Sequence, residues 1–156
     1  YYTPLGAATD KAVRDAYARI AETADEDARI RIESREIHCL RRAGGIIWFD
    51  FATLCGGPRS QNDYLEIASR FHTVILSGIP AMSAAQSSEA RRFTWLIDVF
   101  YDQKVKLIMS AEVPPEQLYT NGMLANEFHR TVSRIIEMQS REYMEKEQRG
   151  AADAIV

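Results

Sequence analysis

Residues 72–110, HTVILSGIPAMSAAQSSEARRFTWLIDVFYDQKVKLIMS, contain two apolar runs separated by a segment with helical periodicity. The runs 72–77 and 104–110 are short and apolar, which is typical of buried strands. Between them, residues 89–102 carry apolar side chains at i, i+3, i+4, i+7 and i+8, starting at Phe93, which predicts a helix with one buried face. Ser88 is the expected N-cap of this helix. A strand, a helix and a second strand in this order predict two parallel strands joined by a crossover helix.

The chain on both sides continues this alternation. Ser60 and Asp63 have the spacing of a capping box, which predicts a helix that starts there and continues to residue 71. A final helix is expected over residues 128–145, with its apolar face formed by Phe128, Val132, Ile135, Ile136 and Tyr143. We therefore predict an α/β unit over residues 60–145, with a short, mostly parallel sheet and flanking helices.

The N-terminal part has a different pattern. Residues 1–23 are expected to contain an entry helix capped by Asp10. Residues 29–33, 36–40 and 46–51 look like three short strands, and we predict that they form a small antiparallel β meander over residues 29–52. Because neighbouring strand residues face opposite sides, Trp48 and Phe49 cannot both enter one core. One of the two is therefore expected to cover an interface and is a candidate partner-binding residue.

Length and composition exclude several classes of protein. The 156 residues fit one domain, and 46% hydrophobic with 26% charged residues is typical of a globular chain. A net charge of −3 argues against a basic nucleic-acid-binding module. No apolar run approaches the length of a membrane span. Two cysteines, Cys39 and Cys55, are too few for a disulfide framework, which favours a reducing, cytoplasmic location.

The ends of the chain also lead to two expectations. The start, Tyr1-Tyr2-Thr3-Pro4, has no initiator methionine and no signal-peptide pattern. An excised domain of a longer chain explains it more simply than a processed mature protein. At the other end, residues 146–156 are expected to be a flexible tail.

Familiar catalytic and metal-binding motifs are missing from the sequence. No glycine is followed by lysine, so the phosphate-binding G-x-x-x-x-G-K-[ST] loop is absent, as are G-x-S-x-G and H-E-x-x-H. The histidines, His38, His72 and His129, do not have the spacing of metal ligands. We therefore predict no metal site and no catalytic residue in this chain, and we do not expect it to catalyse a reaction alone.

Several strings, in this order and spacing, resemble the C-terminal part of the ZapE-type (AFG1-like) P-loop ATPase family over residues 1–145. Among them, R-T-x-S-R-x-x-E-M-Q-S at residues 130–140 is especially specific to that family. One departure is Ser34-Arg35, where the family usually has a Gly-Arg turn. The other strings are YTPLG (2–6), WFDF (48–51), DYLEIA (63–68), FHTV (71–74), ARRF (90–93) and LID (96–98).

The resemblance implies that the parent protein is an AAA+-type ATPase that uses ATP and Mg²⁺. Its phosphate-binding loop would lie in an N-terminal half that precedes Tyr1, and no cofactor is expected for this chain alone. Bacterial members act in cell division at the ring of the tubulin-like division protein, and mitochondrial members in the turnover of respiratory-complex subunits. The implied partners are the ATPase half, the division protein or membrane-protein clients, and other copies of the chain. The implied location is cytoplasmic, peripheral to the inner membrane at the division site.

Within this resemblance, four arginines and one serine are candidate phosphate-sensing residues. Arginines from a C-terminal region of a multimeric ATPase can stabilise charge on the γ-phosphate. The same arginines can instead form ion pairs with Glu127, Glu137 or Asp98 that hold the fold together. Ser110 ends a strand where P-loop folds place a polar sensor, although serine is also a common strand terminator. The candidates are Arg91, Arg92, Arg130, Arg134 and Ser110.

Two functions are therefore expected from the sequence. The first is a coupling or regulatory domain of a ZapE-like ATPase in cell division or membrane-protein quality control. The second is a protein-interaction module that recruits the division-ring protein or a client through Trp48 and Phe49.

Overall fold

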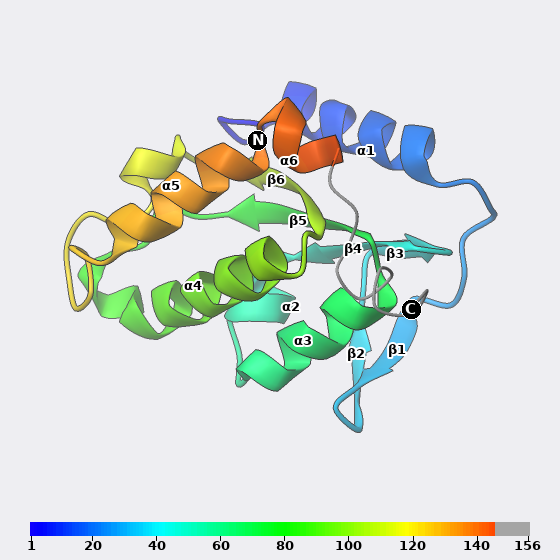
Figure 1. Cartoon of the computed structure of the whole chain (residues 1–156), viewed down its shortest axis with the longest axis horizontal. Helices are drawn as coiled ribbons and strands as arrows, with labels where there is room; N and C mark the ends of the chain where they lie inside the picture. Colours follow the sequence, from blue (N-terminus) through cyan, green and yellow to red (C-terminus); the bar gives the residue numbers. More distant parts are fainter. Residues whose placement is uncertain (146–156) are drawn as a thin grey trace.

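The computed structural model describes residues 1–145 and shows a four-stranded sheet between two layers of helices (Figure 1). The strands are β3 (Arg41–Ala43), β4 (Ile46–Asp50), β5 (Thr73–Ile79) and β6 (Lys106–Ala111), and they lie in this order across the sheet. β3 is antiparallel to β4, whereas β4, β5 and β6 are parallel. The predicted α/β class with a mostly parallel sheet is confirmed. The predicted tail, 146–156, lies outside the described residues.

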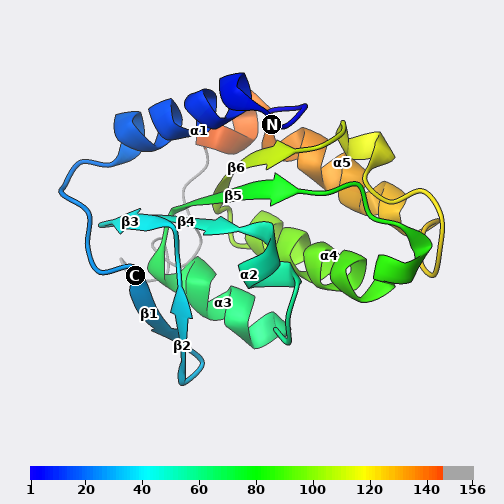
Figure 2. The same cartoon turned by 180° about the vertical axis from the view of Figure 1, so that it is seen from behind.

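Helices cover both faces of the sheet, as the view from behind in Figure 2 shows. One face carries α1 (Ala7–Ile20), whose Val13 and Tyr17 pack on a small core with Ile46 and Ile75. The opposite face carries the larger core. Its helices are α2 (Phe51–Cys55), α3 (Gln61–Arg70), α4 (Ser87–Asp102), α5 (Phe128–Met138) and α6 (Arg141–Glu145), with short 3₁₀ turns at Ala84–Gln86 and Pro115–Gln117.

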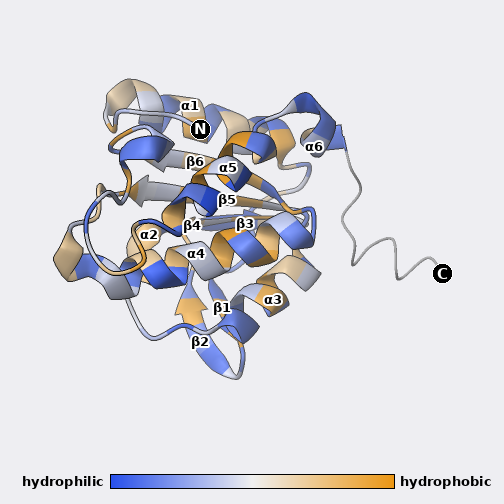
Figure 3. Cartoon of the chain, turned by 60° about the vertical axis from the view of Figure 1, so that its left-hand side comes forward, coloured by the Kyte–Doolittle hydropathy of each residue, from blue (hydrophilic) through white to orange (hydrophobic). Residues whose placement is uncertain are grey.

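The helices on the larger core are amphipathic, and hydrophobic and hydrophilic residues alternate along α3, α4 and α5 in Figure 3. In α4 the buried side chains include Phe93, Leu96, Ile97 and Phe100, which confirms the predicted apolar stripe. No helix within residues 1–145 combines the length and apolarity needed to cross a bilayer.

A two-stranded antiparallel hairpin, formed early in the sequence, lies apart from the four-stranded sheet, beside α3 (Figure 1). It consists of β1 (Arg29–Ile32) and β2 (Arg35–His38), joined by Glu33 and Ser34. Both turn residues have positive φ, 51° and 66°, which is the requirement of a type I′ turn. Ser34 therefore occupies a backbone conformation that glycine would adopt more easily.

The prediction that residues 46–51 form the third strand of an antiparallel meander is wrong. Residues 46–50 do not join the hairpin, because β4 lies inside the main sheet between β3 and β5. The physical reason is visible in its burial, since Ile46, Ile47 and Phe49 are all buried and the strand is covered on both faces. A strand buried on both faces fits a central position in a parallel sheet.

Three helix boundaries also differ from the predictions. The first helix begins at Ala7 after Gly6, so Asp10 lies inside it and does not cap it. The helix of the central segment begins at Ser87, one residue before its expected N-cap, Ser88. The last helix breaks at Gln139, because the Ser140 hydroxyl accepts a hydrogen bond from the Tyr143 N–H and starts α6.

Two further predictions about helices have different outcomes. Ile136, expected on the apolar face of the last helix, is 53% exposed. The capping box of Ser60 and Asp63 is present and confirms the predicted start of α3.

The N-terminal residues lie along the outer edge of β6. Tyr2 forms a parallel bridge with Ser110, in which the Tyr2 N–H donates to the Met109 carbonyl and the Ala111 N–H donates to the Tyr2 carbonyl, both at 2.9 Å. The Tyr1 hydroxyl donates to the Val113 carbonyl at 2.7 Å. Residues 1–3, which we call the N-terminal strap, thus extend the sheet beyond β6 by a short segment from the start of the sequence.

Candidate functional site

The carboxyl ends of β4, β5 and β6 lie at one edge of the sheet, where open α/β folds bind ligands. Ser110, a predicted sensor, is 2% exposed there, and its hydroxyl accepts a hydrogen bond from the Gly78 N–H at 3.0 Å. Gly78 has φ of 73° and lies where the β5–β6 register shifts. In this structure Ser110 therefore holds the irregular end of β5.

Arg134 lies at the junction of α4 and α5. Its Nη1 donates to Asp98 Oδ1, and its guanidinium carbon lies 4.9 Å from the centroid of the Tyr101 ring. The Tyr101 hydroxyl donates to Glu137, and this hydrogen bond is the main reason why the pKa of Tyr101 is raised. The ion pair that the sequence left open as an alternative to phosphate sensing is thus present at Arg134.

Arg92 is also engaged in contacts within the fold. Its Nε donates to the Cys55 carbonyl at 2.7 Å, and its Nη2 lies 3.8 Å from Glu89 Oε1. The first contact joins α4 to the end of α2, and the second lies within α4. Most of this side chain is buried, with 17% of its surface exposed.

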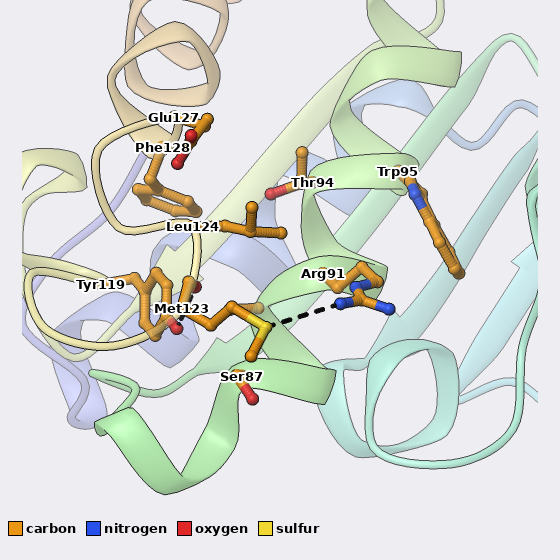
Figure 4. A pocket seen from close by; sticks show the side chains of 10 residues that line it. Ser87, Arg91, Thr94, Trp95, Tyr119, Met123, Leu124, Glu127 and Phe128 are labelled. Atoms are coloured by element: carbon orange, nitrogen blue, oxygen red, sulfur yellow. Dashed lines mark hydrogen bonds between the residues drawn. The ribbon is translucent and has the colours of Figure 1, made fainter.

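Arg91 has a different environment, shown in Figure 4. It is exposed on α4, and its Nη2 lies 3.9 Å from the sulfur of Met123, which is a weak acceptor. Among residues 1–145 it has no carboxylate partner. Within the described residues, Arg91 therefore presents a guanidinium without a carboxylate partner near the start of α4.

Next to Arg91 lies a largely apolar cavity of about 320 Å³, which we call the Met123 cavity. It opens between the start of α4 and the segment that connects β6 to α5 (Figure 4). Met123 and Leu124 are 65% and 47% exposed at this cavity. Its lining residues are Ser87, Ala90, Arg91, Thr94, Trp95, Tyr119, Met123, Leu124, Glu127 and Phe128.

A second, more open cavity of about 360 Å³ lies beside it and shares Thr94 and Glu127 with it. It also contains Asp98, Asn126, His129, Arg130 and Thr131. Arg130 is exposed, and no hydrogen bond or ion pair joins its guanidinium to any residue in the described part of the chain. Of the four candidate arginines, Arg91 and Arg130 thus lack a carboxylate partner within residues 1–145, whereas Arg92 and Arg134 each have one.

Trp48 and Phe49 face opposite sides of β4, as predicted. Phe49 is completely buried in the larger core. Trp48 is half-buried against α1, where its ring centroid lies 5.9 Å from that of Tyr17 and its Nε1 donates to the Ser77 hydroxyl at 2.9 Å. Of the two residues, only Trp48 therefore retains surface that a partner could contact in this conformation.

The cysteines are buried thiols. Burial raises the pKa of the Cys55 thiol to about 12, and it also raises the pKa of Cys39. Both therefore stay protonated near neutral pH, and a protonated thiol is a poor nucleophile. Within residues 1–145, no cluster of three or more histidine, cysteine or carboxylate side chains is arranged to hold a metal ion.

The Met123 cavity was not predicted from the sequence. Its wall includes Tyr119, Met123 and Leu124, which lie in a segment without a periodic apolar pattern. The available signal was the apolar pair Met123 and Leu124 directly after Asn121-Gly122, a dipeptide typical of turns. Apolar side chains in a turn are unusual, because connections are normally polar.

Comparison with known proteins gives consistent matches. The profile of the family described as AFG1-like ATPase matches residues 1–147. Cell division protein ZapE of Escherichia coli (strain K12) is 50% identical over 62% of this chain and 26% of its own length. Lactation elevated protein 1 homolog B of Danio rerio is 32% identical over 92% of this chain and 35% of its own length. The chain thus spans about a third or less of these relatives. No solved structure matches.

Proposed function

The chain belongs to the AFG1-like ATPase family, and on this premise we propose that it is the C-terminal coupling domain of a ZapE-like ATPase. The parent would hydrolyse ATP with Mg²⁺ in an ATPase half outside this chain. Two facts support this division of labour: the sequence has no G-x-x-x-x-G-K-[ST] loop, and the chain covers about a quarter of the ZapE protein that it matches. The domain would contact that half, or a neighbouring copy, and sense its nucleotide.

The observation that carries this proposal is the guanidinium of Arg130, which has no hydrogen-bond or ion-pair partner among residues 1–145. Arg134 and Arg92 are held by Asp98, Glu89 and a backbone carbonyl, so moving either toward a phosphate would break existing bonds. Arg130 is exposed beside the more open cavity and has no such bonds to lose among the described residues. An arginine presented in this way can stabilise the charge that develops on a transferred phosphate.

The test is ATP turnover by the full-length parent protein carrying Arg130→Ala. Arginines that act on the transition state contribute about 10³-fold or more to kcat, so we expect a loss of about that size. The melting temperature should not change, because Arg130 has no partner in the described structure. Arg141→Ala is the matched control, since Arg141 is 91% exposed and its one ion pair within residues 1–145 is with Glu145. Turnover of Arg130→Ala within about twofold of the parent would refute the role of Arg130.

A second function is favoured by a separate observation, the exposed apolar pair at the Met123 cavity. Exposed apolar patches beside a cavity commonly mark sites of protein interaction. We propose that the domain also recruits a protein to the ATPase, either the tubulin-like division protein or a membrane-protein client. This work would take place in the cytoplasm, at the inner membrane.

The test of recruitment is co-sedimentation of the full-length protein with polymers of the purified division protein. The sequence predicts that substitution of Trp48 abolishes this binding, whereas substitution of Arg134 leaves ATP turnover intact. Trp48→Phe is the suitable variant, because it retains an aromatic ring against Tyr17. Unchanged co-sedimentation of this variant would remove Trp48 from the binding surface.

A further inference from the structure

We propose that the Met123 cavity is a docking site for a short acidic peptide segment of a partner protein. An apolar side chain of the segment would enter the cavity, and a neighbouring carboxylate would bind Arg91. The proposal deepens the second function above, because it gives the recruited partner a chemistry and a place. It concerns Arg91 and leaves the assignment of Arg130 untouched.

The shape and lining of the cavity fit an apolar side chain. Its volume of about 320 Å³ is at the small end of the range for ligand sites. Tyr119, Met123, Leu124 and Phe128 lie together on one side of it, and Trp95 lines it from α4, beyond Arg91 (Figure 4). Methionine adapts its shape to different apolar partners, which is why it is common on peptide-binding surfaces.

The charges around the cavity select an acidic segment. Of the described residues that line it, Arg91 is the one cation, and the sulfur of Met123 is the one hydrogen-bond acceptor that its guanidinium contacts among residues 1–145. A guanidinium binds a carboxylate with two parallel hydrogen bonds, so a carboxylate is the natural partner of this group. Glu127 lines another part of the cavity, with Leu124 and Thr94 between it and Arg91 in Figure 4. It repels a carboxylate there and so directs the acidic group to the Arg91 side.

Tyr119 and the local backbone conformation fix the turn that carries Met123 and Leu124. The Tyr119 hydroxyl donates to the Met123 carbonyl at 2.5 Å. Gly122 has φ of 124°, and a Cβ at this position would lie 2.6 Å from the Tyr119 hydroxyl. Leu124 has φ of 66°, a strained conformation for a leucine. Strained residues that surrounding contacts hold in place are concentrated at binding sites, and a preformed site binds with less loss of entropy.

The experiment measures binding of a fluorescent peptide, Ser-Asp-Phe-Leu-Asp-Ser, to the 156-residue chain, together with the ¹³C-methyl signals of its methionines. We expect saturable binding and a shift of the Met123 methyl signal, assigned through Met123→Leu. Arg91→Gln should weaken binding about tenfold, because it removes a charge-assisted pair. Met123→Ser should also weaken it, and this exposed residue can change without loss of the fold. Arg141→Gln is the matched control and should bind within about twofold of the unsubstituted chain.

Peptide variants define the chemistry of the site. Replacing both aspartates by asparagine, or Phe-Leu by Ser-Ser, should each reduce binding at least about tenfold. The proposal is overturned if the acidic peptide does not bind, if a Lys-Phe-Leu-Lys peptide binds equally well, or if Arg91→Gln has no effect. It is also overturned if dilution of the chain alone shifts the Met123 signal, since a second copy would then be the occupant. Retained co-sedimentation with the division protein in any of these cases would leave the second function standing without this site.

Discussion

Replacing Arg134 by methionine separates a structural role from a phosphate-sensing role. The substitution removes the hydrogen-bonded ion pair with Asp98 and the stacking of the guanidinium on the Tyr101 ring. A charge-assisted hydrogen bond contributes about 1.5–3 kcal/mol and a partly exposed cation–π contact about 0.5–1 kcal/mol. Because Asp98 is 36% exposed, water can solvate the carboxylate that remains, so we expect a net loss of about 2 kcal/mol.

Urea unfolding of the 156-residue chain, followed by circular dichroism, measures this loss as a lower midpoint with an unchanged slope. For a chain of this size, about 2 kcal/mol corresponds to a fall in Tm of about 4–8 °C. The double variant with Asp98→Asn should lose little more than the single variants, because both remove the same pair. At a temperature where the variant is folded, the full-length protein should keep its ATP turnover. An Arg134→Met protein with unchanged stability and lost turnover would refute this reasoning.

Three further outcomes are expected. Arg35→Met should lower the free energy of unfolding, measured in urea, by about 2 kcal/mol. The reason is that Arg35 donates two hydrogen bonds of 2.8 Å to the carboxylate of Asp63, which is 1% exposed. A loss below about 0.5 kcal/mol would contradict a stabilising role of this pair. Hydrogen bonds from Arg29 hold the pKa of Asp27 at about 2, below its ordinary value, so its stabilising effect is present near neutral pH and is lost as the pH falls toward 2. The Tm difference between the unsubstituted chain and Asp27→Asn should therefore disappear in acid, and a difference independent of pH would count against it. Cys55 should resist thiol reagents until the chain unfolds, and labelling of the native protein at the rate of a free thiol would show that the site opens.

Local sequence patterns predicted the parts of the fold that depend on local interactions. The capping box at Ser60 and the apolar stripe of α4 follow from side chains a few positions apart, and both are present. The position of β4 could not be predicted in this way. Its neighbour in the sheet, β5, is separated from it in the sequence by α2 and α3. The pairing of β4 with β5 therefore depends on how these two helices pack. Local alternation cannot distinguish that position from a third meander strand.

The candidate site was less predictable for the same reason. The sequence shows that α4 and α5 carry arginines. Which guanidinium has a partner depends on how these helices pack against each other and against α2. Arg134 meets Asp98 across 36 positions of sequence, and Arg92 meets the Cys55 carbonyl across 37. The Met123 cavity depends on a turn held by the Tyr119 hydroxyl, which no periodic pattern reports. The sequence could therefore name the candidates, and only the three-dimensional arrangement could sort them.

The N-terminal strap has a consequence for self-association. Unpaired N–H and C=O groups on an edge strand invite pairing with a strand of another molecule. Tyr2 occupies such groups on β6, and at the opposite edge the Glu26 N–H donates to the Arg42 carbonyl of β3 at 2.9 Å. Removal of residues 1–3 would uncover backbone groups of Met109 and Ala111, and we expect the shortened chain to aggregate through its sheet. With the strap in place, these groups of Met109 and Ala111 are already paired and do not offer themselves to a strand of another molecule.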